Sequence, residues 1–525
     1  MDPQPLTTSR RVLALLIDSL DLQEVQKGVD EGWMPSVAAL VRSGRSASLV
    51  GPNRILPGAA WTTLSTGTSP HEHLLMFDRQ LRPGTYEMDL VTSEAARRPP
   101  FWRYISDAGL SSVILSVYGT PFVTPFLGTQ VIEWGSHDPF AANAGPPSSI
   151  PAKVVEDLDR SIGQRGRLTL KKLPRSIADY REVLRMYLEG IPLHTAAILH
   201  LLEREEWSFF AAGISEPHQA GHLIWHHHDP THPRHDPSAP DDVKASITSL
   251  YKAVDDSVGA IAAAVPKDCT FLVATAHGMG PWYLPGDPLE PLLRTGGWLG
   301  TRPGPGRSAT GLRHWALRTG RRAAHRFLPE SVRSVLGSKL PADRWELETT
   351  FSHVDWTHTR AFALPADRCS FLRINLQGRE PEGIVSREGY DQLCEELTAV
   401  LKELKDADTG EPVVDEVIRL DQHFGIEVRD VLPDLCVIWR EERRIRRIRD
   451  PRFGTITLQN VERRTGHHRP RGWVAAVGPG IQASHSTRIG EAGEFNLLDI
   501  GPTVLSQLSI GSPGLPGTPI EPLVS

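Results

Sequence analysis

The feature that most constrains the fold is a series of short, uninterrupted apolar runs. The first is Val12–Ile17, which is bounded by polar residues. An unbroken run of this length is typical of a strand that is buried on both faces of a parallel sheet. Similar runs recur along the chain, with helical patterns between them, at 112–117, 209–214, 271–275 and 473–477. This alternation predicts an α/β fold with a doubly wound, mostly parallel sheet.

The length of 525 residues exceeds the ~250 to 300 residues at which one core usually stops growing. Between residues 281 and 359 the pattern changes to Gly/Pro-rich loops and an arginine-rich helical stretch. We interpret 281–359 as an inserted helical cap, so that 10–280 and 360–522 form the α/β core. The cap carries four arginines that either face an anionic substrate or lie on a solvated helix face, namely Arg318, Arg321, Arg322 and Arg326.

Charge and hydropathy limit the classes of molecule that the protein is expected to bind. The net charge of −6 provides no basic field that would coat a nucleic acid, which favours a small-molecule anionic substrate. The early apolar run ends at Asp18 and is too short for a membrane span or a signal peptide, so we expect no membrane segment and a cytoplasmic protein. The four cysteines show no close pairing and are expected to be free thiols. The sequence leaves the oligomeric state open.

Titratable residues follow several of the predicted strands. In open α/β sheets, ligands bind beyond the carboxyl ends of the strands. Asp18 follows the first run, residues 216–222 follow the run at 209–214, and residues 276–278 follow the run at 271–275. Histidine is unusually frequent, with 21 residues, and clustered imidazoles are common metal ligands. Titratable residues therefore stand where this architecture would place a functional site.

One further histidine cluster lies at His226–His235, where proline residues interrupt the sequence. We interpret this segment as a solvated loop and do not count its histidines as metal ligands.

Five sequence blocks occur in an order that is typical of one family. They are Asp18, Trp61–Gly67 with Ser69–His73, Glu216–His222, Thr275–Met279, and Gly466–Gly472 with Gly478–Ile481. Together they resemble the type I phosphodiesterase/nucleotide pyrophosphatase branch of the alkaline phosphatase superfamily, and residues 498–505 resemble its last helix. The resemblance extends from about residue 10 to residue 522. It implies an alkaline phosphatase-like fold.

The resemblance also implies a chemistry. Members of the family use two metal ions, usually zinc, which clamp a phosphoryl oxygen while a Thr or Ser alkoxide attacks. By position in the motifs, four residues of this chain match metal ligands of the family, namely Asp18, His222, His277 and His468.

Three positions depart from the family pattern. Pro57 stands at the position of the nucleophile, and proline has no nucleophilic atom. His218 replaces the aspartate of the Asp-x-x-x-His block, and Ala276 replaces the aspartate of the Asp-His pair. A hydroxyl group from Thr62, Thr63 or Ser65 is a poor substitute for the nucleophile, because a shift along a helix swings the group away from a fixed metal.

These departures predict one strongly bound divalent transition metal. His218 and His222 lie on one face if they are helical, and His468 completes a three-histidine site. Three imidazoles with an open position suit zinc, or a redox-active iron, copper or manganese ion. Asp18 and His277 remain at the second metal position, too few to bind an ion tightly unless another residue joins them.

Two residues are candidate catalytic acids or bases. Glu216 lies two residues before His218, where it either acts on the substrate or orients a ligand, and His467 adjoins His468. His73 follows the proline of its block, and we interpret it as structural.

Three functions fit these residues. The first is hydrolysis of a small phosphoester by a metal-bound hydroxide that replaces the Thr or Ser nucleophile. The second is oxidative or lyase chemistry at a mononuclear three-histidine iron or copper site. The third is a catalytically silent binding protein, although a decayed site would rarely gain a ligand such as His218.

Overall fold

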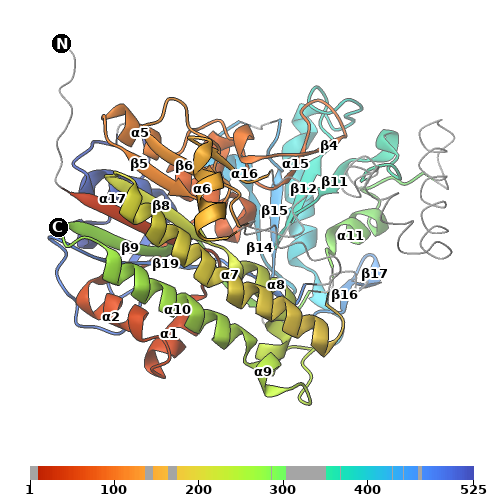
Figure 1. Ribbon diagram of the computed structural model, residues 1–525. Coiled ribbons are helices and arrows are strands. Elements are labelled where there is room, and N and C mark those ends of the chain that lie inside the picture. Colours follow the sequence, from red (N-terminus) through yellow and green to blue (C-terminus); the bar gives the residue numbers. More distant parts are fainter. Residues whose placement is uncertain are drawn as a thin grey trace, which may run out of the picture. The chain divides into compact units, whose positions relative to one another are not determined.

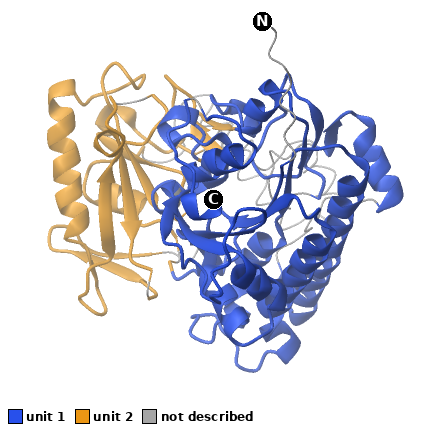
Figure 2. Ribbon diagram, turned by 90° about the vertical axis from the view of Figure 1, so that its left-hand side faces the viewer, with its two compact units in different colours: residues 1–76, 92–283, 463–525 blue, residues 77–91, 284–462 orange. Residues whose placement is uncertain are grey.

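The computed structural model describes residues 10–135, 146–163, 174–284, 286–302, 350–366, 368–427, 430–441, 443–458, 464–512 and 514–524. The chain divides into two compact units (Figure 2). The first unit comprises residues 1–76, 92–283 and 463–525, and the second comprises 77–91 and 284–462. This division differs from the expected one, because residues 360–462 belong to the second unit instead of the core. Residues 303–349, which include the four cap arginines, lie outside the described residues.

The first unit is built on a nine-stranded sheet. Its order is β20 (Glu494–Asn496), β2 (Arg45–Val50), β19 (Gly472–Val477), β9 (Cys269–Thr275), β1 (Arg11–Ile17), β8 (Phe209–Ile214), β5 (Ser112–Leu115), β6 (Gly128–Ile132) and β7 (Ser148–Ile150). Strand β1 lies between β8 and β9 and is parallel to both. Strands β19 and β7 run antiparallel to their neighbours. The five apolar runs are all strands of this sheet, and the α/β prediction is confirmed.

Side chains of β1 alternate between two apolar clusters. The odd-numbered residues from Leu13 to Ile17 belong to one cluster, and the even-numbered residues from Val12 to Leu16 belong to the other. Because helices cover both faces of the sheet, every position of the strand is apolar, and this produces the continuous run in the sequence.

Helices form the two outer layers of the first unit. The odd-numbered face packs against α1 (Leu22–Asp30), α2 (Pro35–Ser43), α6 (Lys153–Ser161), α7 (Ile177–Arg204), α8 (Glu216–His228) and α10 (Ser246–Ala264). The even-numbered face packs against α3 (Ala60–Thr66), α5 (Trp102–Asp107) and α17 (Ile500–Gln507). Figure 1 shows α7 and α10 side by side along the sheet. Two short helices, α4 (Pro70–His73) and α9 (Asp241–Lys244), complete the unit.

The second unit contains antiparallel sheets. The largest has the order β11 (Ala361–Leu364), β12 (Ser370–Ile374), β15 (Leu435–Trp439) and β14 (Val414–Arg419). The smaller sheets are β13 (Lys405–Asp406), β16 (Arg447–Asp450) and β17 (Gly454–Thr457), and β3 (Arg79–Leu81) with β4 (Met88–Leu90). Its helices include α11 (Leu289–Thr295), α15 (Arg387–Lys402) and α16 (Leu420–Phe424). The short connection between β11 and β12 permits only an antiparallel pair, so these strands do not extend the parallel sheet.

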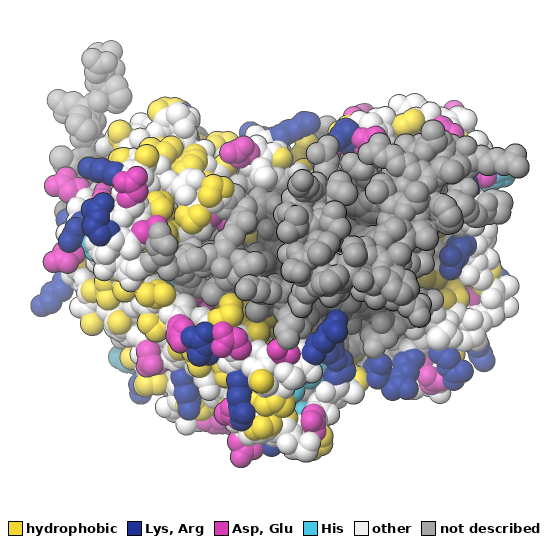
Figure 3. Space-filling model, turned by 45° about the vertical axis from the view of Figure 1, so that its right-hand side comes forward, with side chains coloured by type: hydrophobic (Ala, Val, Ile, Leu, Met, Phe, Trp, Pro, Cys, Tyr) yellow, Lys and Arg dark blue, Asp and Glu magenta, His cyan; other side chains and the backbone are white. Residues whose placement is uncertain are grey.

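Within the described residues, no helix is both long enough and apolar enough to cross a membrane. Basic and acidic side chains lie among one another over much of the described part of the face in Figure 3. All four cysteines are buried and free.

The histidines at 226–228 do not lie in a solvated loop. They form the last turn of α8, and His226 and His227 are each only 4% exposed. Their ring centroids are 3.9 Å apart, and Tyr180 of α7 meets both rings edge-on. After Pro217 no proline interrupts the helix. The next one, Pro230, lies beyond its end, so the helix can continue through the three histidines.

Burial of His226 predicts a pH-dependent stability. Removal from water, together with the positive charges of His227 and Arg234, lowers the pKa of His226 from 6.5 to about 2. Below pH 6.5 the unfolded chain therefore binds a proton that the folded chain excludes. The free energy of unfolding is expected to fall by about 1.4 kcal/mol per pH unit for this group as the pH decreases from 6.5 towards 2.

Urea denaturation at several pH values tests this expectation. In a His226→Phe variant the decrease between pH 6.5 and 5 should be smaller than in the unmodified protein, because phenylalanine binds no proton. The imidazole Nδ1 of His226 has no hydrogen-bond partner among the described residues, so the apolar ring loses no known contact. An equal pH dependence in both proteins would contradict the assignment.

Candidate metal centre

Helix α8 and strand β18 bring together three histidines. Helix α8 begins directly after β8, and Pro217 in its first turn favours that start. His218 and His222 are four residues apart and therefore share one face of the helix. His468 lies on β18 (Gly466–Arg469), which pairs antiparallel with β10 (Gly278–Pro281).

Close approach of β18 to α8 depends on glycine. A Cβ atom on Gly466 would lie 2.3 Å from the carbonyl oxygen of Gly221, and a Cβ atom on Gly221 would lie 2.5 Å from the side chain of Met279. Both contacts are too short for a side chain. The two glycines therefore allow His468 to reach the histidines of the helix.

The three imidazoles converge through the same ring atom. The Nε2 atom of His218 lies 2.8 Å from Nε2 of His468 and 3.0 Å from Nε2 of His222. Each of the three residues is at most 9% exposed. Among the described residues, this is the group of three whose possible ligand atoms all lie within 4.8 Å of one another.

In two of these imidazoles the opposite ring atom, Nδ1, faces an oxygen atom. The Nδ1 atom of His222 lies 2.8 Å from the carbonyl oxygen of Gly466, a contact in which the ring N–H donates. The Nδ1 atom of His218 lies 3.4 Å from Oδ2 of Asp18. Since a carbonyl oxygen only accepts, Nδ1 of His222 carries the proton and its Nε2 lone pair points into the cluster, which is the usual arrangement of metal-binding histidines. The donor set fits a divalent transition metal with imidazole ligands.

Asp18 and His277 lie beside the three histidines and outside that group. Oδ1 of Asp18 accepts hydrogen bonds from Nε1 of Trp61 at 3.1 Å and from Oγ of Ser19 at 3.2 Å, and it lies 3.4 Å from Nε2 of His277. Burial raises the pKa of Asp18 to about 7, and the charge of His468 and these hydrogen bonds limit the rise. Asp18 thus lies within ion-pair distance of the imidazoles of both His218 and His277. Sequence reasoning missed the Trp61 contact, although Trp61 belongs to a recognised block.

Glu216 faces helix α7. Its side chain is fully buried, and Oε1 lies 3.2 Å from Nδ1 of His194. Oε2 accepts the backbone N–H of Ser215 at 3.1 Å, and Nε2 of His194 lies 3.2 Å from the carbonyl oxygen of Trp134. These contacts anchor the first turn of α8 to its neighbours, and they do not place the carboxylate on the metal ligands.

Removal of this carboxylate is expected to destabilise the fold more than the metal centre. A Glu216→Ala variant removes the acceptor seen at His194 Nδ1, which costs about 1 to 3 kcal/mol for a buried polar group. Urea denaturation should show this loss, while elemental analysis of the folded fraction should show unchanged metal content. Loss of metal without loss of stability would instead assign Glu216 to the centre.

His467 contacts a different surface from His468. Neighbouring residues of a strand point to opposite faces, and the ring of His467 packs against Trp282 with centroids 4.3 Å apart. Its Nδ1 accepts the backbone N–H of His468 at 2.8 Å. His467 is therefore not one of the three converging imidazoles.

Pro57 is the residue that the motif spacing predicts at the position of the family's nucleophile. It is buried at the start of a short 3-10 helix, Pro57–Ala59, directly before α3. Its ring carries no hydroxyl, so this position supplies no attacking oxygen.

Nearby hydroxyl groups have local partners. Oγ1 of Thr63 lies 3.1 Å from Nε2 of His73, and Oγ of Ser65 donates to the carbonyl oxygen of Thr62 at 3.2 Å. His73 is fully buried, which fits its interpretation as structural, and burial lowers its pKa to about 3. The hydroxyls of Thr63 and Ser65 are thus engaged within the helical segment.

Comparison with known proteins assigns the family. A model of the family described as "Type I phosphodiesterase / nucleotide pyrophosphatase" matches residues 12–462, which leaves the late block with His468 beyond the matched residues. A search of curated proteins found no significant match.

Two solved structures resemble the chain along nearly its whole length. A phosphonoacetate hydrolase from Sinorhizobium meliloti 1021, in complex with phosphonoacetate, is 13% identical, with 96% of each chain covered and a TM-score of 0.50. The wild-type alkaline phosphatase PafA is 12% identical, with 99% of this chain and 100% of that chain covered and a TM-score of 0.51. Identities this low show a shared fold. The family match, which covers most of the chain, shows that it belongs to the type I phosphodiesterase/nucleotide pyrophosphatase family.

Proposed function

We propose that the chain is a metal-dependent phosphoester hydrolase with one divalent transition metal, held by His218, His222 and His468. The observation that carries this proposal is the convergence of three buried Nε2 atoms, in which those of His222 and His468 both lie within 3.0 Å of that of His218. Membership in a phosphodiesterase family supports a phosphoester as substrate. Three neutral ligands would leave a bound divalent ion with its full positive charge, which suits an anionic substrate.

The residues of the centre have different roles. The three imidazoles hold the ion, and Asp18 orients His218 from behind while Trp61 orients Asp18. When bound, a divalent ion polarises a phosphoryl oxygen and acidifies a water molecule. Because Pro57 supplies no nucleophile, water would attack phosphorus directly. The new P–O bond would form as the ester P–O bond breaks, and the proton lost by the water would pass to the leaving alkoxide to give the alcohol.

The nitrogen-only ligand set favours a second candidate. No carboxylate belongs to the three-histidine group, and Ala276 replaces the aspartate that the family pattern has at the second metal position. A site of this kind also suits iron, copper or manganese, with oxidative or lyase chemistry in place of hydrolysis.

Metal identity separates the two candidates. The protein is purified without added metal, analysed for its elements, and assayed with bis-p-nitrophenyl phosphate and p-nitrophenyl phosphate. About one equivalent of zinc, with hydrolysis that is lost after chelation and restored by zinc, is expected. Stoichiometric iron or copper without hydrolysis would favour the second candidate and contradict the first.

Direct attack by water predicts that position 57 is dispensable for the chemistry. A Pro57→Ala variant should hydrolyse phosphoesters within about threefold of the unmodified protein, because neither residue supplies a reacting atom. Intact-mass measurement during turnover should detect no phosphorylated protein. A trapped phosphoryl-protein, in either form, would show that another side chain acts as nucleophile.

A further inference from the structure

A serine hydroxyl joins Asp18 and His277, the two residues that match ligands of the family's second metal ion. Oγ of Ser19 donates to Oδ1 of Asp18 at 3.2 Å and lies 3.2 Å from Nδ1 of His277. Nε2 of His277 in turn lies 3.4 Å from the same Oδ1. The three side chains therefore form a closed ring of contacts, and each residue is at most 3% exposed.

An unusual backbone conformation places this hydroxyl between its two partners. The φ angle of Ser19 is 61°, a value that side-chain-bearing residues rarely adopt. The carbonyl oxygen of Ser19 accepts the hydroxyl of Tyr251 at 3.4 Å, and that same hydroxyl accepts the backbone N–H of Asp21 at 2.9 Å. Contacts with α10 and with the N-terminal cap of α1 therefore hold Ser19 in a conformation that costs energy. Such conformations gather at functional sites.

The residues around this ring of contacts do not fit a second metal ion. The family pattern gives four positions to that ion, and only Asp18 and His277 retain a ligand atom, whereas Pro57 and Ala276 have none. Ala276 is fully buried and belongs to the same apolar cluster as Trp61. Nε1 of Trp61 donates to Oδ1 of Asp18 at 3.1 Å, beside the hydrogen bond from the serine. An ion on this oxygen would have to displace two hydrogen-bond donors that already satisfy it.

We propose that Ser19 takes the place of the second ion, as a positioning residue that links Asp18 to His277. Oδ2 of Asp18 lies 3.4 Å from Nδ1 of His218, and the ring of His277 packs against that of His468 with centroids 4.3 Å apart. A hydroxyl that fixes Asp18 and His277 therefore fixes the surroundings of two proposed metal ligands. The inference rests on the proposed function, because it concerns the affinity of the three-histidine centre for its ion.

Titration of the metal-depleted protein with Co²⁺ tests this role without catalysis. The visible absorption of bound Co²⁺ reports both its affinity and its coordination geometry. The unmodified protein is expected to bind about one equivalent. A Ser19→Gly variant lacks the hydroxyl, and it should fold because glycine adopts a positive φ angle readily. It should bind the same one equivalent about tenfold more weakly, with an altered spectrum.

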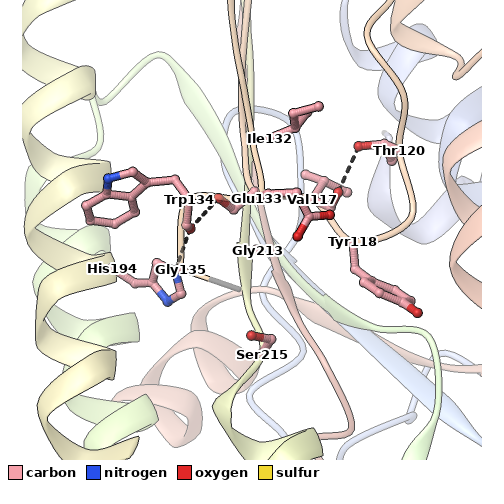
Figure 4. Close-up of a pocket in the computed structure, with 11 residues that line it drawn as sticks. Val117, Tyr118, Thr120, Ile132, Glu133, Trp134, Gly135, His194, Gly213 and Ser215 are labelled. Atoms are coloured by element: carbon pink, nitrogen blue, oxygen red, sulfur yellow. Dashed lines mark hydrogen bonds between the residues drawn. The ribbon is translucent and has the colours of Figure 1, made fainter. Parts of the chain in front are cut away.

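Ser116 supplies a matched control. It directly follows β5 with a φ angle of 49°, and its Oγ donates to the carbonyl oxygen of Trp134 at 2.6 Å, a hydrogen bond drawn at Trp134 in Figure 4. A Ser116→Gly variant loses a hydroxyl at the same kind of backbone position and should bind Co²⁺ like the unmodified protein. Equal weakening in both glycine variants would show a general effect on the fold and contradict the role of Ser19.

The number of bound ions tests the replacement itself. A Ser19→Gly/Ala276→Asp double variant removes the hydroxyl and restores a carboxylate, so its folded fraction should bind about two equivalents of Co²⁺. A second tightly bound equivalent in the unmodified protein, or only one in the folded double variant, would overturn the proposal. If the unmodified protein binds no Co²⁺, the proposed function fails and this inference with it. One equivalent bound equally well by the unmodified protein and by the Ser19→Gly variant would overturn this inference alone.

Discussion

Replacement of His222 by alanine is expected to lower the metal content from about one equivalent to nearly none and to reduce phosphoester hydrolysis by at least about a hundredfold. His222 supplies one of three converging Nε2 atoms and is fixed by the carbonyl oxygen of Gly466. Its loss leaves two imidazoles, too few for tight binding. Elemental analysis after gel filtration, together with the rate of bis-p-nitrophenyl phosphate hydrolysis, measures both effects.

His228 supplies a matched control for this substitution. It lies at the end of the same helix, is half-buried, and its Nε2 atom is 3.2 Å from Oε2 of Glu24. A His228→Gln variant should keep its metal and its activity. Retention of one equivalent of metal by the His222→Ala protein would contradict the three-histidine centre. Equal metal loss in both variants would show a general effect on α8.

The convergence of His218, His222 and His468 was predictable because the relevant information is local in the sequence. His218 and His222 have helical spacing after a buried strand, and His468 lies in a recognisable block. The partners of neighbouring residues were not predictable in this way. Glu216 contacts His194, which lies on a helix that precedes β8, and no short-range pattern connects the two residues. The position of Glu216 two residues before His218 therefore did not predict the direction in which the Glu216 side chain points.

Whether a segment forms a strand was also easier to predict than which strand it pairs with. The apolar runs at 112–117, 209–214 and 473–477 all occur as strands, as the pattern predicted. Apolar periodicity specifies whether a segment is a strand, and the partner strand is chosen by contacts distant in the sequence. The antiparallel sheet of the second unit, and with it the boundary between the units, was consequently missed.

A buried charge network stabilises that second unit. Nη1 and Nη2 of Arg379 donate to the two carboxylate oxygens of Asp434, each at 2.7 Å. Asp434 also accepts the backbone N–H of Ile374 at 2.6 Å and the hydroxyl of Tyr390 at 2.8 Å. Burial alone would raise the pKa of Asp434, but the charges and hydrogen bonds of its partners, above all Arg379, hold that pKa below its ordinary value. The carboxylate therefore stays charged in the folded protein at neutral pH.

A second carboxylate, Glu380, and a second arginine, Arg373, belong to the same network. Nε of Arg373 donates to Oε1 of Glu380 at 2.6 Å, and Nε of Arg379 donates to Glu380 at 2.9 Å. Two arginines and two carboxylates thus share one buried region, and each of the four side chains is at most 5% exposed. The network is electrically neutral only when Asp434 is charged.

An Asp434→Asn variant is expected to lower the free energy of unfolding of the second unit by about 3 to 5 kcal/mol, because it leaves a buried arginine charge without compensation. Urea denaturation followed by the fluorescence of Trp439, a buried residue of β15, measures the change. The control is Asp408→Asn, which removes an exposed partner of Arg447 and should cost less than about 1 kcal/mol. Equal losses in the two variants would contradict the role of burial. Because the three proposed metal ligands belong to the first unit, the folded fraction of the Asp434→Asn protein should retain any bound metal.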